Sequence, residues 1–176
     1  EEAGYLATRH LLGLGHTEIA CITGPADIGA SSARVLGYQR ALDEARLPAC
    51  PELVVPGDFT FRGGEGGMQF LLAMAKPPSA VFAGNDMMAI GAMAAAREMG
   101  FSVPTEISVI GFDDIELAAL LRPALTTMAQ PVEELAQIVT SRLIEKMACG
   151  LSGWENKKIV LKARLVVRDS TARNKR

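Results

Sequence analysis

Side chains that could bind a small polar ligand follow four apolar segments of the sequence. These residues are Arg34 after "EIACIT" and its loop, Phe59 after "ELVVPGD", Asn85 after "SAVFAG" and Asp113 after "SVIGF". A carboxylate accepts and a guanidinium donates paired hydrogen bonds to neighbouring hydroxyls, and an aromatic face covers the C–H side of a sugar ring. Each charge-assisted hydrogen bond contributes about 1.5–3 kcal/mol. The combination favours a polyhydroxylated small molecule as the ligand.

Each of these residues also has a purely structural interpretation. Arg34 could be a surface residue of a helix, and Phe59 could belong to the core. Asp86 and Asp114 each precede a helical segment, where a short polar side chain can accept a hydrogen bond from a backbone N–H. We therefore expect both aspartates to be N-caps. The sequence logic alone leaves the ligand-binding and structural interpretations open.

No pattern of catalytic or metal-binding residues accompanies this set. The chain has no G-x-S-x-G elbow, no histidine placed beside a serine or cysteine, and no metal-ligand cluster. The glycine cluster at 63–67 follows no strand directly and lacks the spacing of a phosphate-binding loop, so we reject that interpretation. The apolar spacing at about 3–14 predicts a first helix, and His10 and His16, near its end, are expected to be structural. We therefore expect no enzymatic activity, no cofactor and no metal.

Strands and helices alternate along the chain. Segments rich in β-branched and apolar residues are "EIACIT", "ELVVP", "SAVFAG" and "EISVIGF", and helical segments lie between them, at about 34–46, 68–75 and 86–99. Such alternation predicts crossover connections and a parallel sheet. The strands are continuously apolar, as expected when helices cover both faces. We predict an α/β fold with an open, doubly wound parallel sheet, followed by a helix at 131–148 and a last strand in "KIVLKARLVV".

Composition and charge restrict the partners. The 176 residues carry a net charge of -2, which provides no basic surface for nucleic acid. Cys21, Cys50 and Cys149 are too widely spaced for a zinc site or a disulfide framework. No apolar run approaches the roughly 18 residues of a membrane-spanning helix, and no signal-peptide pattern opens the chain. We expect a single-domain, cytoplasmic protein without a membrane partner.

Six segments of the chain resemble signature segments of one family of bacterial transcription regulators. They are "GYLATRHLLGLGHTEIACITGP", "ARVLGYQRAL", "VPGDFT", "AVFAGNDMMAIGAMAAAREMGFSVPTEISVIGFDD", "RPALTTMAQP" and "RLVVRDST", in order over nearly the whole chain. The family is the LacI/GalR (lactose-repressor/galactose-repressor) type. The resemblance implies a type I periplasmic-binding-protein-like fold, in which a helix-turn-helix head precedes two α/β lobes that close on a small effector.

The resemblance also implies how this chain is divided. The chain opens on Glu1 rather than Met, so we expect a part of a longer repressor that lacks the helix-turn-helix head. Residues 1–128 would form the C-terminal lobe of the effector-binding domain. Residues 129–150 would form a crossover and a helix that packs on the absent N-terminal lobe, and residues 151–176 a return segment, last strand and tail. Operator DNA would be bound only through the absent head.

Carried over from the family, the effector contacts fall on Arg34, Phe59, Asn85, Asp113 and Gln130. Only Gln130 rests on the resemblance alone, because the other four follow strands. The implied effector is a sugar, nucleoside or related small metabolite. Two other classes share features with this sequence: a periplasmic sugar-binding protein, which has the same fold, and a flavodoxin-like enzyme.

The helix at 86–99 predicts a homodimer. No charged residue lies between Asp86 and Arg97, so the helix is apolar on every side and needs cover on two faces. The sheet can cover one face. We expect a symmetry-related copy to contact Ile90, Met93, Ala94, Leu120 and Leu121, where the resemblance also places the family's dimer contact. The alternative is a helix buried wholly within one lobe.

The helix at 131–148 has an apolar face without an obvious partner in this chain. Its members are Leu135, Ile138, Val139, Leu143 and Met147. Each such side chain left in water forfeits about 1.5–3 kcal/mol. The helix could fold back on its own lobe, pair with a neighbouring copy, or belong with a missing lobe. We expect intermolecular cover, and weak effector binding as long as the other half of the cleft is missing.

Overall fold

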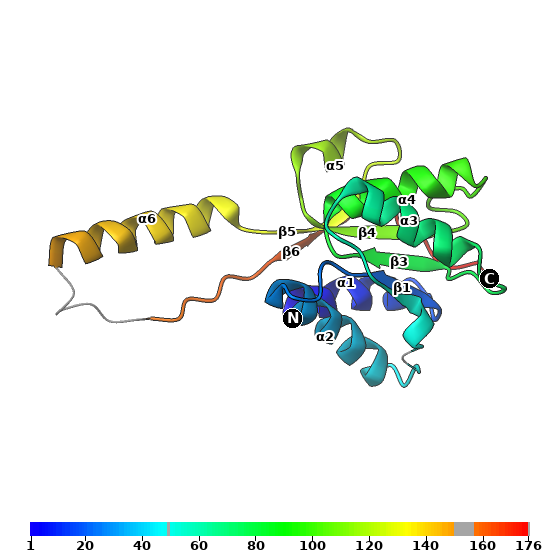
Figure 1. The fold of residues 1–176 in the computed structure, drawn as a ribbon, viewed down its shortest axis with the longest axis horizontal. Coiled ribbons are helices and arrows are strands. Elements are labelled where there is room, and N and C mark those ends of the chain that lie inside the picture. The colour runs from blue at the N-terminus through cyan, green and yellow to red at the C-terminus, as the bar shows by residue number, and fades with distance from the viewer. Residues whose placement is uncertain (49, 150–156, 176) are drawn as a thin grey trace.

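A largely parallel sheet forms the centre of the chain (Figure 1). Within residues 1–48, 50–149 and 157–175, which the computed structural model describes, the sheet has the strand order β2-β1-β3-β4-β5-β6. The parallel strands are β1 (Ile19–Ile22), β2 (Val54–Val55), β3 (Ala80–Ala83), β4 (Ser108–Asp113) and β5 (Thr126–Ala129). The last strand, β6 (Arg164–Val166), pairs antiparallel with β5. The reversal of order between β1 and β3 is that of a doubly wound fold, which confirms the predicted fold class.

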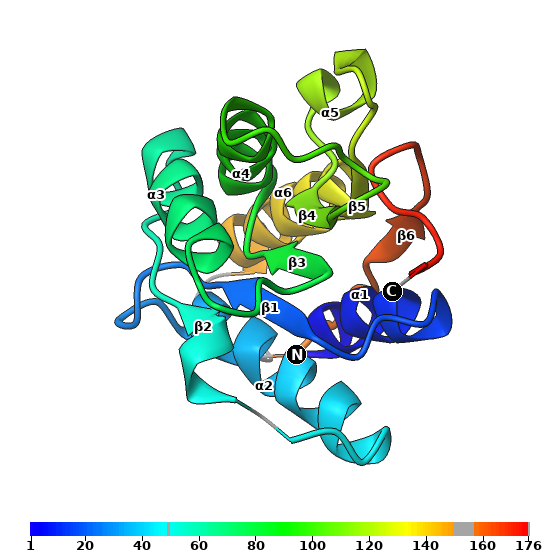
Figure 2. The same ribbon diagram turned by 90° about the vertical axis from the view of Figure 1, so that its right-hand side faces the viewer.

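Helices cover both faces of this sheet (Figure 2). The helices α1 (Glu2–Gly13) and α2 (Gly29–Glu44) pack on one face, and α3 (Phe61–Leu72) and α4 (Asp86–Glu98) pack on the other. The 3₁₀ helix η1 (Pro51–Leu53) precedes β2, and the short helix α5 (Glu116–Leu120) follows β4. A long helix, α6 (Val132–Cys149), follows β5.

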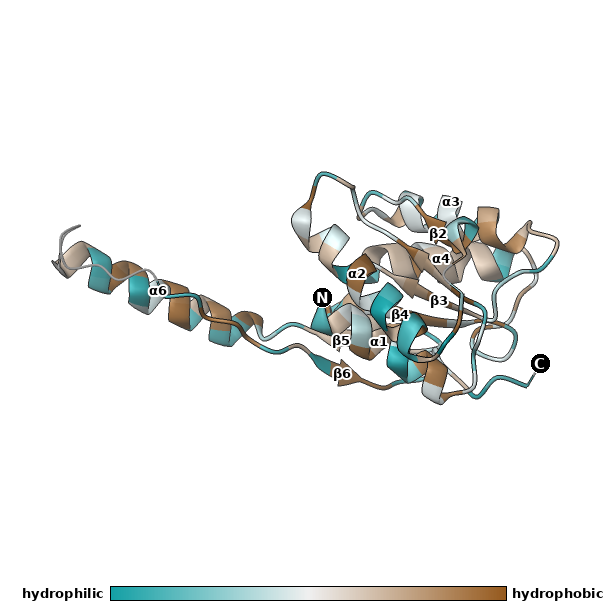
Figure 3. Cartoon of the chain, turned by 90° about the horizontal axis from the view of Figure 1, so that it is seen from below, coloured by the Kyte–Doolittle hydropathy of each residue, from teal (hydrophilic) through white to brown (hydrophobic). Residues whose placement is uncertain are grey.

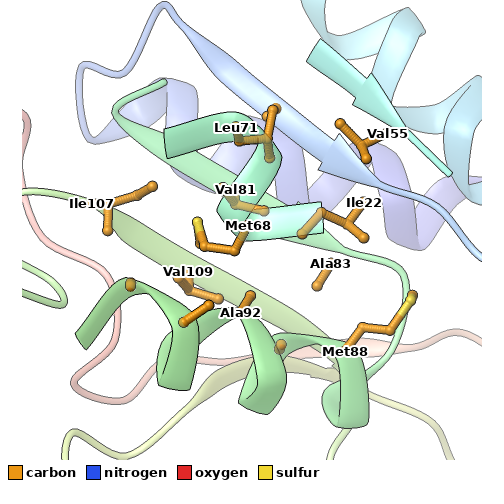
Figure 4. Close-up of a cluster of buried hydrophobic side chains, with 14 of the residues drawn as sticks. Ile22, Val55, Met68, Leu71, Val81, Ala83, Met88, Ala92, Ile107 and Val109 are labelled. Atoms are coloured by element: carbon orange, nitrogen blue, oxygen red, sulfur yellow. The ribbon is translucent and has the colours of Figure 1, made fainter. Parts of the chain in front are cut away.

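The central strands are apolar on both faces because each face has its own core. Neighbouring residues of a strand point to opposite faces. Ile19 and Cys21 of β1 pack with α1 and α2, whereas Ala20 and Ile22 pack with α3 and α4. Figure 4 shows the second of these clusters, in which Met68 of α3 lies among side chains of the strands and of α4. The interpretation of the continuous apolar runs is confirmed.

The expected start of the third helix at residue 68 is wrong. α3 begins at Phe61, and Thr60 is its N-cap, because the Thr60 hydroxyl accepts a hydrogen bond from the Gly63 N–H over 3.1 Å. Glycine is a poor helix former, so the cluster at 63–67 hid the first turns of the helix. Tertiary packing and the cap outweigh that low propensity.

Glycines let α3 and α4 approach each other closely. A Cβ atom on Gly64 would meet the backbone carbonyl of Met88, and a Cβ atom on Gly91 would meet the carbonyl of Phe61. In contrast, a Cβ atom on Gly66 would meet no atom within 4 Å. Gly64 and Gly91 thus form a glycine surface between α3 and α4, and residues 63–67 lie within a helix, in agreement with their rejection as a phosphate-binding loop.

Three other boundaries differ from those expected. α2 begins at Gly29, inside a segment expected to be a loop, and the last strand is confined to Arg164–Val166. β5 was not expected as a strand, because its two threonines are polar and the segment lacks the continuous apolar pattern of the other strands. Both hydroxyls are satisfied internally: Thr127 donates to Asp86, and the Thr126 Oγ1 lies 3.3 Å from Thr171 Oγ1.

Neither Asp86 nor Asp114 caps a helix, contrary to our expectation. Asn85 is the N-cap of α4, since its Oδ1 accepts a hydrogen bond from the Met88 N–H over 2.9 Å. The N-cap of α5 is Ile115, which makes no capping side-chain hydrogen bond. Both aspartates instead accept hydrogen bonds from distant segments: Asp86 from Thr127 and Ile115, and Asp114 from Arg168.

The two histidines anchor the C-terminal tail, residues 167–175. His16 is buried, with Nδ1 2.8 Å from Ser79 Oγ and Nε2 3.0 Å from the carbonyl oxygen of Ala172. His10 Nε2 lies 3.0 Å from Thr171 Oγ1, and burial lowers the pKa of His10. The expectation of a structural role is confirmed for both.

α6 extends away from the rest of the chain (Figures 1 and 3). Most of its apolar side chains stay exposed, from 48% at Leu135 to 78% at Met147, whereas Ile138 is half-buried. No helix among the described residues, α6 included, is long and apolar enough to cross a membrane. The side chain of Cys149 and residues 150–156, with the start of the expected return segment, lie outside the described part of the chain. Cover by a neighbouring copy stays a prediction.

The glycine surface predicts opposite effects for two similar substitutions. Gly64→Ala should destabilise the fold by about 1–3 kcal/mol, because the added methyl forces α3 and α4 apart. Gly66→Ala should stabilise it by about 0.5–1 kcal/mol, because alanine is the better helix former and open space surrounds the position. Urea unfolding of both variants measures the difference. Equal stability of the two variants would contradict the assignment of Gly64 to the packing surface.

Candidate functional site

The predicted site residues lie together at the edge where the parallel strands end. Arg34 Nη1 donates to the carbonyl oxygen of Gly84, just after β3, over 2.6 Å. Gln130, just after β5, donates to Asp113 at the end of β4 through a side-chain hydrogen bond of 2.6 Å. Because the strand order reverses between β1 and β3, this edge contains the crevice in which doubly wound folds bind ligands.

Arg34 is held flat by aromatic rings. Its guanidinium carbon lies 3.7 Å from the centroid of the Phe112 ring and 5.6 Å from that of Phe59. Burial lowers the pKa of Arg34 and the nearby Asp113 raises it, and a guanidinium stays charged at any physiological pH. Stacking and the bond to Gly84 fix the plane of the guanidinium, so it can present paired donors in a defined direction.

Phe59 and Asn85 support each other. Phe59 has a left-handed backbone, with φ of 65°, and its ring lies so close to Gly24 that a Cβ atom there would collide with it. Asn85 Nδ2 donates to the Phe59 carbonyl oxygen over 2.9 Å, while its Oδ1 caps α4. An amide can make four hydrogen bonds, so capacity remains on Asn85 for a ligand beside this structural role.

Asp113 carries the carboxylate at the centre of the edge. It ends β4 with φ of 127°, and its Oδ1 accepts the hydrogen bond from Gln130. Burial raises the pKa of Asp113, whereas the bond from Gln130 and the charge of Arg34 lower it. The carboxylate thus lies half-buried between a donor amide and a cation, with its second oxygen able to accept from a hydroxyl.

Sequence reasoning missed four residues that shape this edge: Phe112, Asp86, Thr127 and Arg168. Phe112 stacks under Arg34, and only the alternation of side chains along β4 could have placed it there. Asp86 is fully buried. Its position directly after the strand-end residue Asn85 could have indicated that it lies at the same edge of the sheet. Arg168 forms an ion pair of 2.6 Å with Asp114 from 54 residues away, and no local pattern predicts such a pair.

The site is open on the side of α6. A hollow of about 920 Å³ shares Phe112 and Gln130 with the site and continues between the start of α1, the start of α6 and the segment 158–163. A second hollow, of about 630 Å³, lies between α6 and residues 157–161. Phe112 and Gln130 therefore connect the site with the hollow beside α6.

The predicted dimer residues form an apolar surface. Ile90, Met93, Ala94 and Leu121 line a groove of about 590 Å³, and Leu120 lies nearby with 66% of its surface exposed. The opposite side of α4 is buried against the sheet through residues such as Met88 and Ala92. The helix is therefore apolar on its exposed side as well as its core side.

Comparison with known proteins identifies related chains. The family described as "Periplasmic binding protein-like domain" matches residues 8–171. The ribose operon repressor of Escherichia coli (strain K12) is 45% identical over 144 residues, covering 82% of this chain and 44% of the repressor. The HTH-type transcriptional repressor PurR of Salmonella arizonae is 38% identical over 171 residues, covering 97% of this chain and 50% of PurR.

A solved structure shares the fold. The LacI family transcriptional regulator from Enterococcus faecium, with bound ribose, superimposes with a TM-score of 0.88 at 36% identity, covering 99% of this chain and 63% of the regulator. This chain spans about half the length of the curated relatives that it matches. With residues 8–171 matched and the repressors aligned in sequence and fold, the chain belongs to the periplasmic binding protein-like domain family, as the C-terminal part of the effector-binding region of a LacI/GalR-type regulator.

Proposed function

We propose that the chain senses a sugar or a related small metabolite within a dimeric transcriptional repressor. The observation that carries this proposal is the convergence of Arg34, Asp113 and Gln130 at the carboxyl edge of the sheet. The relatives support the same class, since two are transcriptional repressors and one solved regulator holds ribose. The chemistry is recognition, so no enzymatic step is proposed.

The geometry suits a polyhydroxylated ligand. Asp113 accepts from two vicinal hydroxyls, and Arg34 donates to the oxygens of the neighbouring pair. Phe59 offers an aromatic face for the C–H side of a ring, while Asn85 and Gln130 add donors and acceptors at the rim. Several such hydrogen bonds, at about 1.5–3 kcal/mol each, give selectivity among sugars of similar size.

A second lobe completes the cleft in this proposal. Residues 1–128 form one lobe, and residues 129–150 cross to the other lobe, on which α6 packs. Residues 151–176 return for the last strand. The exposed apolar face of α6 and the open side of the site support this division, because both need cover. Operator DNA is bound by a head outside residues 1–176, in the cytoplasm.

Two copies of the chain associate through the groove on α4. Ile90, Met93 and Ala94 contact the partner, together with Leu120 and Leu121. The support is the apolar lining of the groove and the exposure of Leu120, since exposed apolar surface of this kind is typical of protein interfaces.

Asp113→Asn tests the ligand site. A thermal-shift screen of pentoses, hexoses and nucleosides first finds a ligand that stabilises the complete protein. Calorimetry should then show at least about tenfold weaker binding by Asp113→Asn, because a hydrogen bond to a charged acceptor is replaced by a neutral one. The control, Asp169→Asn, changes an exposed aspartate away from the site and should bind normally. Unchanged affinity in Asp113→Asn would remove Asp113 from the site.

Leu120→Lys tests the dimer. The residue is exposed in the single chain, so the charge should leave the fold intact and place an ammonium in the proposed interface. Sedimentation should show a dimer for the complete protein and a shift toward monomer for Leu120→Lys. Leu36→Lys, on the exposed side of α2, is the matched control and should sediment as the dimer. A strict monomer of the unsubstituted protein at high micromolar concentration would contradict the proposal.

A further inference from the structure

Asp86 is a fully buried carboxylate at the start of α4, beside the cap residue Asn85. Its Oδ1 accepts a hydrogen bond of 2.6 Å from the Thr127 hydroxyl, and its Oδ2 accepts one of 2.9 Å from the Ile115 N–H. Burial raises the pKa of Asp86, while these donors lower it. Asp86 takes part in no ion pair with the other described residues. A buried carboxylate without an ion partner costs stability even when neutral donors satisfy its oxygens, so its presence here calls for an explanation.

The turn that leaves β4 needs outside support. Asp113 and Asp114 both have positive φ, 127° and 64°, and residues other than glycine keep such conformations only where the surroundings hold them. Asp86 accepts a hydrogen bond from the next backbone N–H, that of Ile115. From the other side Arg168 pairs with the Asp114 carboxylate. The turn is thus fixed from both sides.

The strand itself makes room for this carboxylate. A Cβ atom on Gly111 would collide with Asp86 Oδ1, so any other residue at this position of β4 would displace Asp86. Thr127, the second donor, lies on β5, and Gln130 directly follows that strand. Asp86 therefore joins the ends of β4 and β5, the two strands that present Asp113 and Gln130 to each other.

We infer that Asp86 is a positioning residue of the proposed site: it fixes the Asp113–Asp114 turn against β5, so that the Asp113 carboxylate meets Gln130 and faces the ligand. The inference rests on the proposed function only in treating Asp113 as a ligand-binding group. The positioning itself is a property of the unliganded chain, so it can be measured without a ligand.

Asp86→Ala removes both acceptors, and nuclear magnetic resonance reports the result. The side-chain amide signal of Gln130 should move to its position in Asp113→Ala, because the bond between Gln130 and Asp113 is lost. Exchange of the Ile115 amide should accelerate by at least about tenfold, because its acceptor is gone. Asp86→Asn, which keeps one oxygen for Ile115, should recover part of both changes. A folded Asp86→Ala with the Gln130 signal in its original position overturns the inference.

Thr127→Val provides a second route in case Asp86→Ala does not fold. It removes one donor at nearly constant volume and should move the Gln130 signal, whereas Thr127→Ser should restore it. Thr8→Val, which loses a buried hydroxyl bond in α1, is the matched control and should leave Gln130 unchanged. A Gln130 signal that moves equally in Thr8→Val and Thr127→Val overturns the inference, because the effect would then be general.

Calorimetry with D-ribose on the complete protein links positioning to binding. If the unsubstituted protein binds ribose, Thr127→Val should bind at least about tenfold more weakly and Thr8→Val normally. Equal ribose affinity in all three overturns the inference. If the unsubstituted protein binds neither ribose nor any other sugar or nucleoside of the screen, the proposed function fails, and the Gln130 signal alone then decides the role of Asp86.

Discussion

Complete burial of both faces of the parallel sheet determines where this chain can bind a ligand. The helix pairs α1–α2 and α3–α4 occupy the two faces, so backbone groups and side chains meet a ligand only at the strand ends. At one of these edges the reversal of strand order separates the connections after β1 and β3. Arg34 and Phe59, which arrive from opposite faces, meet in this crevice.

The polar groups at this edge depend on one another through a connected set of contacts. Phe112 fixes the plane of Arg34, Gln130 fixes the Asp113 carboxylate, and Asp86 fixes the turn that carries it. Rigid placement matters because a ligand then does not have to order these side chains when it binds. In the proposed site, recognition would therefore rely on residues inside the sheet as much as on those that face the ligand.

Sequence patterns predicted the position of residues that follow strands. They gave wrong roles to residues whose partners lie on distant segments of the chain. Arg34, Asn85 and Asp113 follow strands, so strand order alone brought them to one edge. Asp86 and Asp114 were misassigned as caps because the N-cap rule is local, whereas their partners Thr127 and Arg168 lie 41 and 54 residues away. The start of α3 was misplaced for a related reason: the glycines at 63–67 are poor helix formers, and the close approach of α4 to Gly64 is a tertiary contact that no local pattern predicts.

The pairing of Ala129 with Arg164 gives the chain a two-stranded tether. β5 leads out to α6 and β6 leads back beside it, so α6 and the return segment leave and re-enter the body at one place (Figure 1). Gln130 lies between β5 and α6, at this point of attachment, and also donates a hydrogen bond to Asp113. Any force that α6 transmits to the sheet would therefore meet the Asp113 carboxylate first.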